Sequence, residues 1–306
     1  MAESDRTRLL AIVGATAVGK SSLAMRLAAR FGGEIVGADS RHVYRYMDIG
    51  TAKPTSEDRS EIPHHVIDVV DPDEHFGLAV YLELGTLAIQ NAKGNGNLPI
   101  LVGGTGQYVW ALLEGWQVPQ VPPDAETRSE MEELARASGH AVVLAVLREL
   151  DPEAADRVDP SNVRRVIRAV EVARSGNIGA PDKIPPPYDV MAVGLTMPRP
   201  QLYRRIDERV DEMLSEGWLD EVRGLLDRGY ESDLPAMSGV GYREFSEHLV
   251  NGANLDEAVA RTKTRTHAFA RRQHAWFKRD DPRIHWFDAP AGFSDAEDAV
   301  ERWLNA

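Results

Sequence analysis

The chain has 306 residues, more than one typical domain, so we expect a core with an insertion or appended helices. It contains no cysteine, which excludes disulfides, thiolate zinc sites and thiol nucleophiles and favours a reducing, cytoplasmic location. The net charge of -13 argues against a general nucleic-acid binder but leaves room for a basic groove on an acidic body. No apolar run approaches the roughly 20 residues of a membrane span, so we expect neither a signal peptide nor an anchor.

The first motif is a complete phosphate-binding loop that directly follows the apolar residues 9–13. It consists of Gly14, Ala15, Thr16, Ala17, Val18, Gly19, Lys20 and Ser21. A buried strand is predicted to lead into a turn whose backbone N–H groups face phosphate oxygens, and the helix predicted over 22–28 faces the same anion with its positive end. Lys20 is predicted to reach the terminal phosphates and Ser21 to ligate Mg²⁺. The chain is therefore predicted to bind a di- or triphosphate.

Further apolar segments predict strands over residues 34–39, 98–104, 190–195 and 284–287. Because these segments alternate with helical patterns, we expect a parallel sheet flanked by helices, an α/β fold like that of P-loop NTPases. Ligands bind such sheets beyond the carboxyl ends of the strands. Asp39 and Thr105 are both expected on that edge.

Residues 116–189 are predicted to form a helical insertion between the two parts of the core, residues 1–115 and 190–306. A proline-rich break precedes Asp124, which is a suitable N-cap for a helix running to Ser138. Ser161 or Asn162 is expected to cap a second helix over 163–174.

The third predicted strand ends in Gly103-Gly104-Thr105-Gly106, where many hydrolytic NTPases carry an acid that positions a metal. The transferred group therefore need not be phosphate. Several motifs also occur in a fixed order: GATAVGKS at 14–21, DSRHVY at 39–44, MDIGTAKP at 47–54, PHHVID at 63–68 and VGGTG at 102–106. They continue with RRVIRAVE at 164–171, GVGYR at 239–243 and ARRQHAWF at 270–277.

Together these motifs resemble those of the bacterial tRNA dimethylallyltransferase family, and the resemblance spans nearly the whole chain. This family transfers a dimethylallyl group from its diphosphate to the exocyclic amine of the adenosine just 3′ of the anticodon. The resemblance implies that Asp39 is the general base, that Thr105 hydrogen-bonds near the reacting groups and that Arg205 grips the pyrophosphate. It also implies Mg²⁺ as cofactor, with dimethylallyl diphosphate and the anticodon stem-loop of tRNA as the partners of a monomeric enzyme.

The target base lies in a stacked loop and must be extruded, so local basic clusters are expected to hold the RNA. The expected tRNA-binding residues come from the sheet edge, the insertion and the C-terminal helices. They are Asp39, Ser40, Arg41, His42, Thr105, Arg128, Arg164, Arg165, Arg168, Gly241, Tyr242, Arg243, Arg271, Arg272 and Gln273. An ordinary solvated face is the alternative interpretation for any single arginine.

The family pattern has glutamine where this chain has His42. A neutral imidazole donates at one nitrogen and accepts at the other, so base recognition can survive, but activity is expected to depend on pH. The animal and yeast relatives carry a C-terminal zinc finger, which a cysteine-free chain lacks, and this favours a bacterial-type enzyme.

Two other classes of function remain open from the sequence. A small-molecule or nucleotide kinase would also use the phosphate loop and Asp39, and it would reveal itself by phosphorylating a small acceptor. A nucleotide-dependent RNA-binding module would bind tRNA tightly without forming a product. Neither explains the other ordered motifs. The chain has no paired Asp-Asp-x-x-Asp motifs, which argues against the aspartate-rich prenyltransferases.

Overall fold

A computed structural model describes residues 6–119, 121–176 and 183–306 of the chain. The strands in these ranges are β1 Thr7–Gly14, β2 Gly33–Gly37, β3 His64–His65, β4 Leu98–Val102, β5 Tyr188–Thr196 and β6 Ile284–Asp288. The helices up to the middle of the chain are α1 Lys20–Phe31, α2 Ser56–Glu61, α3 Leu78–Gly94, α4 Gly106–Glu114, α5 Ala125–Ser138, α6 His140–Leu150, α7 Pro152–Arg157 and α8 Val163–Arg174. The later ones are α9 Arg199–Ser215, α10 Trp218–Asp227, α11 Tyr242–Asn251, α12 Leu255–Trp276 and α13 Phe293–Leu304.

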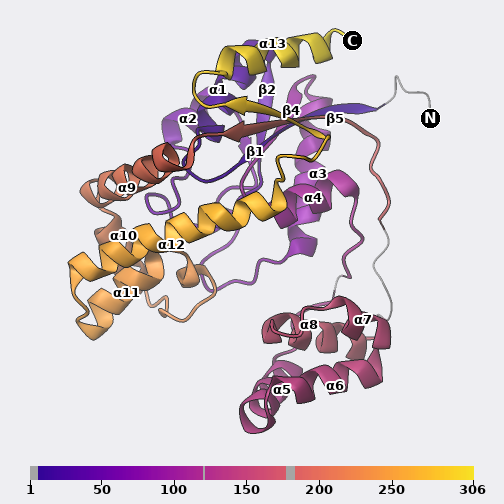
Figure 1. The fold of residues 1–306 in the computed structure, drawn as a ribbon, viewed down its shortest axis with the longest axis vertical. Coiled ribbons are helices and arrows are strands. Elements are labelled where there is room, and N and C mark those ends of the chain that lie inside the picture. The colour runs from indigo at the N-terminus through magenta and orange to yellow at the C-terminus, as the bar shows by residue number, and fades with distance from the viewer. Residues whose placement is uncertain (1–5, 120, 177–182) are drawn as a thin grey trace. The chain divides into compact units, whose positions relative to one another are not determined.

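All the strands join one parallel sheet in the order β3-β2-β4-β1-β5-β6 (Figure 1). The central strand β1 pairs with β4 on one side and β5 on the other, so that Leu10 lies between Ile100 and Met191. Residues of β1 alternate between the two faces of the sheet. Leu10 and Ile12 join a buried cluster with residues of α1, α9, α12 and α13. Helix α3 packs against β2 and β4. This arrangement confirms the predicted α/β fold.

Both strands that carry predicted site residues at their ends are shorter than the sequence indicated. β2 ends at Gly37 and β4 at Val102, before Asp39 and Thr105 are reached. The chain turns there because Gly103 lies directly against Ala38, whose carbonyl oxygen would be 2.0 Å from a Cβ at position 103. Asp39 and Thr105 therefore lie on loops just beyond the carboxyl edge of the sheet.

The chain divides into two compact units. One combines the described residues up to Leu113 with Pro186–Ala306, and the other runs from Glu114 to Pro185. The division falls a few residues earlier than the boundaries predicted at 115/116 and 189/190. The second unit contains α5 to α8 around its own apolar cluster, which includes Met131, Val143 and Val170.

Two helix caps in the second unit follow the sequence. The Asp124 side chain accepts hydrogen bonds from the amides of Glu126 and Thr127 at the start of α5, as predicted. Asn162 caps α8, so Ser161 was the wrong one of the two candidates. The amide and hydroxyl of Ser161 instead donate to Asp159.

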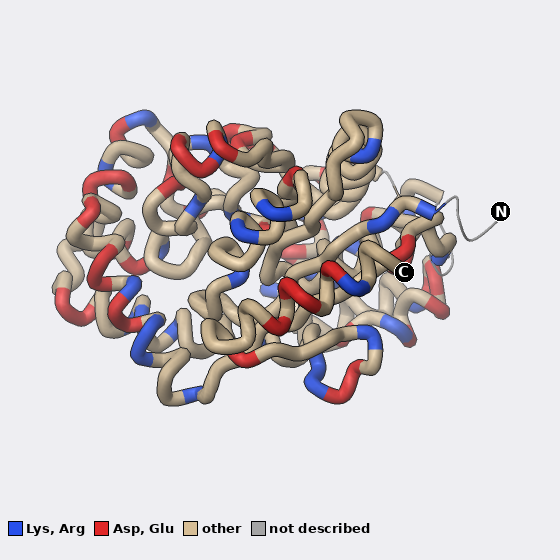
Figure 2. The backbone as a smooth tube through the Cα atoms, turned by 90° about the horizontal axis from the view of Figure 1, so that it is seen from above, with Lys and Arg blue, Asp and Glu red and all other residues tan. Residues whose placement is uncertain are grey.

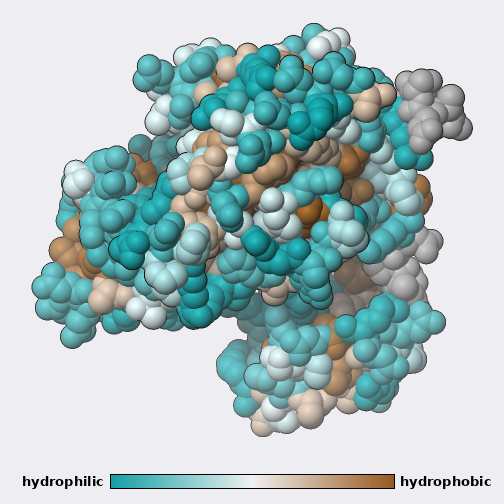
Figure 3. Space-filling view, turned by 45° about the horizontal axis from the view of Figure 1, so that its top comes forward, coloured by the Kyte–Doolittle hydropathy of each residue, from teal (hydrophilic) through white to brown (hydrophobic). Residues whose placement is uncertain are grey.

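Basic and acidic residues are interspersed along the described chain (Figure 2). The face shown in Figure 3 is mostly hydrophilic, with apolar residues gathered in small patches. No helix among the described residues is long and apolar enough to cross a lipid bilayer.

Candidate active site

The phosphate-binding loop joins β1 to α1 and depends on two glycines. Gly14 has a φ of 141°, and a Cβ there would lie 2.6 Å from the carbonyl oxygen of Leu195. Gly19 has a φ of 107° and forms the N-cap of α1. Side chains other than hydrogen are strained in this backbone region, so the loop requires glycine at both positions.

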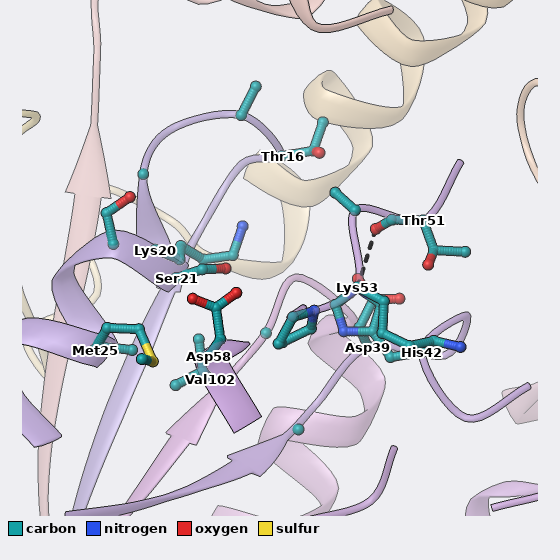
Figure 4. A pocket seen from close by; sticks show the side chains of 18 of the residues that line it. Thr16, Lys20, Ser21, Met25, Asp39, His42, Thr51, Lys53, Asp58 and Val102 are labelled. Carbon is teal, nitrogen blue, oxygen red and sulfur yellow. Dashed lines mark hydrogen bonds between the residues drawn. The ribbon is translucent and has the colours of Figure 1, made fainter. Parts of the chain in front are cut away.

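Residues 16, 17 and 19–21 of the loop line a pocket of about 470 Å³. In this pocket Lys20, Asp58 and Asp39 come from three different segments and face the same space (Figure 4). The Lys20 ammonium donates to the carbonyl oxygen of Ala15 at 2.8 Å. Burial lowers the pKa of Lys20 to about 8; the Asp39 carboxylate raises it in part, and the Arg209 guanidinium lowers it further. The Lys20 ammonium is thus positioned to bind an anion in this pocket.

Asp39 lines both this pocket and a second one of about 250 Å³. One of its carboxylate oxygens accepts a hydrogen bond from the amide of Arg41 at 2.9 Å, which fixes the side chain at the start of its loop. The other residues that line both pockets are Thr16, Ala17, Thr51, Ala52 and Arg209. A group bound in either pocket therefore meets the same carboxylate.

Helix α9 brings two arginines to the site. Arg205, which was predicted, lines the first pocket, and Arg209 lines both. Burial lowers the pKa of Arg209, and Arg205 lowers it further, whereas Asp39 raises it. Arg209 was not among the predicted site residues, although a spacing of four residues places it on the same helical face as Arg205.

Thr105 holds the Asp39 loop without lining either pocket. Its hydroxyl oxygen accepts a hydrogen bond from the amide of Ser40 at 3.0 Å, and its own amide donates to the carbonyl oxygen of Ala38 at 3.1 Å. Thr105 is thus bonded to Ala38 and Ser40, the residues immediately before and after Asp39. These two hydrogen bonds help to position Asp39.

Two residues expected to contact tRNA are buried instead. Gln273 is 3% exposed; its carbonyl oxygen accepts from the amide of Thr16 at 2.7 Å, and its amide nitrogen donates to the carbonyl oxygen of Gly104 at 3.0 Å. Tyr242 is 1% exposed, and its hydroxyl donates to Glu221 at 2.6 Å. The polar atoms of both side chains are thus bonded within the protein, where they support the pocket walls.

Other predicted residues on the sheet edge also make internal contacts. Arg41 donates to the carbonyl oxygens of Pro235 and Ala236 at 2.8 and 3.1 Å while lining the second pocket. The His42 Nε2 atom lies 3.0 Å from the carbonyl oxygen of Thr51 in the first pocket (Figure 4). Because a carbonyl only accepts, Nε2 carries the proton and a neutral His42 keeps Nδ1 as an acceptor.

The predicted basic residues of α11 and α12 differ in their surroundings. Arg272 lines the second pocket, whose wall also includes Gly239. Arg271 donates to the Tyr203 hydroxyl at 2.9 Å, and Arg243 pairs with Glu247 at 3.3 Å. Gly241 lies at a φ of 89° at the N-cap of α11.

In the helical unit, two of the four predicted arginines are paired with a buried acid. Arg128 and Arg168 lie 3.0 and 2.9 Å from the carboxylate of Glu171. Arg164 and Arg165 are exposed on α8. Both of these arginines are thus on the surface of the unit, where a phosphate backbone can reach them.

Comparison with known proteins places these motifs in a family. The profile of the family described as IPP transferase matches residues 42–280. Over 274 residues the chain is 56% identical to a protein of Roseiflexus castenholzii named tRNA dimethylallyltransferase, which covers 89% of this chain and 90% of that protein. A protein of the same name from Roseiflexus sp. strain RS-1 is 53% identical over 305 residues, covering 97% of this chain and 99% of its own.

Two solved structures are also similar. The full-length tRNA isopentenylpyrophosphate transferase of Bacillus halodurans matches with a TM-score of 0.73 at 38% identity, covering 98% of this chain and 97% of that one. A eukaryotic dimethylallyltransferase captured acting on tRNA matches with a TM-score of 0.76 at 27% identity, covering 97% of this chain and 77% of its own. With a family profile matching most of its length and relatives more than half identical, this chain belongs to the IPP transferase family.

Proposed function

We propose that the chain is a tRNA dimethylallyltransferase, which transfers the dimethylallyl group from dimethylallyl diphosphate to the exocyclic amine of the adenosine 3′ of the anticodon, at tRNA position 37, and releases pyrophosphate. The observation that carries this proposal is the position of Asp39 on a wall shared by two pockets, one of which contains the phosphate-binding loop. A prenyl donor bound in the first pocket and an adenosine bound in the second can thus both reach the Asp39 carboxylate, which is the proposed general base.

The chemistry assigns a role to each group in the first pocket. The adenine amine is a poor nucleophile, so the bond between the allylic carbon and its oxygen must weaken as the carbon–nitrogen bond forms, and charge grows on the leaving pyrophosphate. Lys20, Arg205, Arg209 and the loop amides stabilise that charge. Asp39 takes the proton that the amine loses.

Mg²⁺ is the proposed cofactor, and the residues present fit it. Ser21 brings a hydroxyl oxygen to the wall of the first pocket and Asp39 a carboxylate, and Mg²⁺ prefers oxygen ligands together with substrate phosphates. We assign the ion to Ser21 and the diphosphate. When bound, it adds positive charge opposite the leaving group.

The second pocket is the proposed entry for the extruded adenosine. Four residues expected to serve tRNA line it, namely Asp39, Arg41, Tyr242 and Arg272. Extrusion exposes the base edge and its amine, which a stacked loop hides. Arg164, Arg165, Arg243 and Arg271 are proposed to contact the RNA backbone. We further propose that the enzyme acts as a cytoplasmic monomer.

The test is mass spectrometry of nucleosides from unmodified tRNA after incubation with the protein, Mg²⁺ and dimethylallyl diphosphate. We expect a dimethylallyl adduct on the adenosine 3′ of the anticodon. A tRNA with another base at that position is the control and should remain unmodified. No adduct, together with ATP-dependent phosphorylation of a small acceptor, would assign the site to a kinase. Tight tRNA binding with neither product would assign it to a binding module.

Pyrophosphate affinity is expected to fall as pH rises above about 8. The Lys20 ammonium, whose pKa is about 8 in the free protein, is neutral at higher pH, so anion binding must then take up a proton. The dissociation constant should rise by up to about tenfold per pH unit through this step. Calorimetry with inorganic pyrophosphate from about pH 7 to 9.5, in two buffers of different ionisation enthalpy, measures both affinity and proton uptake. Lys20→Met is the control. In this variant only pyrophosphate itself titrates, so the proton uptake that belongs to Lys20 should be absent.

His42→Gln, which restores the glutamine of the family pattern, is expected to keep the rate of prenyl transfer within a few-fold of wild type. The neutral imidazole donates from Nε2 to the carbonyl oxygen of Thr51 and offers an acceptor at Nδ1, and a glutamine amide can supply one donor and one acceptor as well. Single-turnover rates of both proteins check the prediction. A large rate loss in His42→Gln would show that the amide does not replace the ring.

A further inference from the structure

The Glu221 carboxylate on α10 binds a row of three consecutive backbone amides. Its Oε2 atom accepts from the amides of Asp48 and Ile49, both at 2.7 Å, and its Oε1 atom accepts from the amide of Gly50 at 3.2 Å. Oε1 also accepts from the Tyr242 hydroxyl at 2.6 Å. Successive amides that converge on one anion form a nest, and here the anion belongs to the protein itself.

The residues that follow the nest form the wall between the two pockets. Thr51 and Ala52 line both of them. Beyond them Lys53 is buried, and its ammonium donates to Asp48 and Asp68 at 2.6 and 2.7 Å. Lys53 thus links the segment 48–53 to Asp68, and Glu221 links it to α10.

The packing of Trp218 restricts the position of the segment 48–53. Trp218, one turn before Glu221, lies against Gly50, where a Cβ would be 1.8 Å from its indole nitrogen. The same ring covers Gly241, where a Cβ would be 2.0 Å from the Trp218 Cζ2 atom. The tryptophan also lines the second pocket. The carboxylate and the ring next to it therefore determine where the segment meets α10.

We propose that Glu221 is a positioning residue for prenyl transfer: by holding the amides of residues 48–50 it places Thr51 and Ala52, which line both pockets together with Asp39, and so aligns the acceptor amine with the donor carbon. This role rests on the proposed function. It requires a carboxylate, because all four partners donate hydrogen bonds. An amide at this position would turn an N–H group toward another donor.

Glu221→Gln, which preserves the size of the side chain, tests the proposal. Residues 48–50 and Glu221 are not among those that line the first pocket, so pyrophosphate affinity should stay within about twofold of wild type, while the single-turnover rate with saturating substrates falls at least about tenfold, as expected for lost alignment. Asp220→Asn is the matched control, since its carboxylate on the same helix is 77% exposed. It should change neither quantity.

Hydrogen exchange supplies a readout that does not depend on catalysis. The amides of residues 48–50 should exchange slowly in the wild type and in Asp220→Asn, and at least about tenfold faster in Glu221→Gln. Slow exchange in all three proteins, or an unchanged transfer rate in Glu221→Gln, would overturn the proposal. So would a rate loss matched by an equal loss of pyrophosphate affinity, which indicates general unfolding. If the wild type forms no adduct, the proposed function fails, and with it the alignment role; the exchange data then test only the nest.

Discussion

Replacing Asp39 with asparagine is expected to lower the rate of prenyl transfer about 100- to 10,000-fold, the range that general-base groups contribute. The substitution keeps the size of the side chain and an acceptor for the Arg41 amide. It also removes a negative charge that faces Lys20 and Arg209, so pyrophosphate should bind as tightly as to the wild type or more tightly. Single-turnover mass spectrometry and calorimetry with pyrophosphate measure the two quantities.

Asp58→Asn is the matched control for this variant, because Asp58 lines the first pocket but not the second. An asparagine there keeps an oxygen that can cap α2, where Thr55 and Asp58 form a capping box. Its rate should stay within a few-fold of wild type. Turnover within tenfold of wild type in Asp39→Asn would remove Asp39 as the base.

Replacing Lys20 with methionine is expected to lower the transfer rate about 100- to 1,000-fold, as losing one preorganised donor to a developing anion does. Pyrophosphate affinity should fall as well, because the ammonium serves the bound anion and the departing one alike. The melting temperature should not fall, since burial disfavours the charged form of Lys20 and methionine has a similar shape without the charge.

Thermal unfolding and single-turnover assays on the same preparation separate these effects. Lys93→Met on the exposed end of α3 serves as the control for loss of a positive charge. A Lys20→Met protein that is strongly destabilised would show that the lysine supports the fold. A rate within fivefold of wild type would mean that the phosphate loop is not the donor site.

The parts of the site that could be predicted depend on short stretches of sequence. The phosphate loop is specified by glycines at positions 14 and 19 with a strand before and a helix after, so neighbouring residues determine its conformation. Asp39 lies in one of the ordered motifs and Arg205 is implied by the resemblance to the family, and both line the first pocket.

The features of the site that the sequence does not indicate depend on packing between distant segments. Gln273 and Tyr242 lie in motifs rich in arginine or glycine, and nothing in those motifs indicates that their side chains are buried. Arg128 and Arg168 read as a basic surface because their common partner, Glu171, becomes a buried acid only when α5 and α8 pack together. Glu221 looks like any helical acid until the amides of residues 48–50 are brought to it.

The hydrogen bond between Thr16 and Gln273 joins the phosphate-binding loop to α12. The first third of the chain therefore does not build the diphosphate site by itself. The amide of Thr16 donates to the side-chain oxygen of Gln273, 257 positions away, and the amide nitrogen of the same side chain donates to the carbonyl oxygen of Gly104. The cradle for the diphosphate is therefore completed only when the last long helix has been synthesised and docked. A nascent or truncated chain ending before that helix carries the whole phosphate-binding motif but lacks the frame that shapes it.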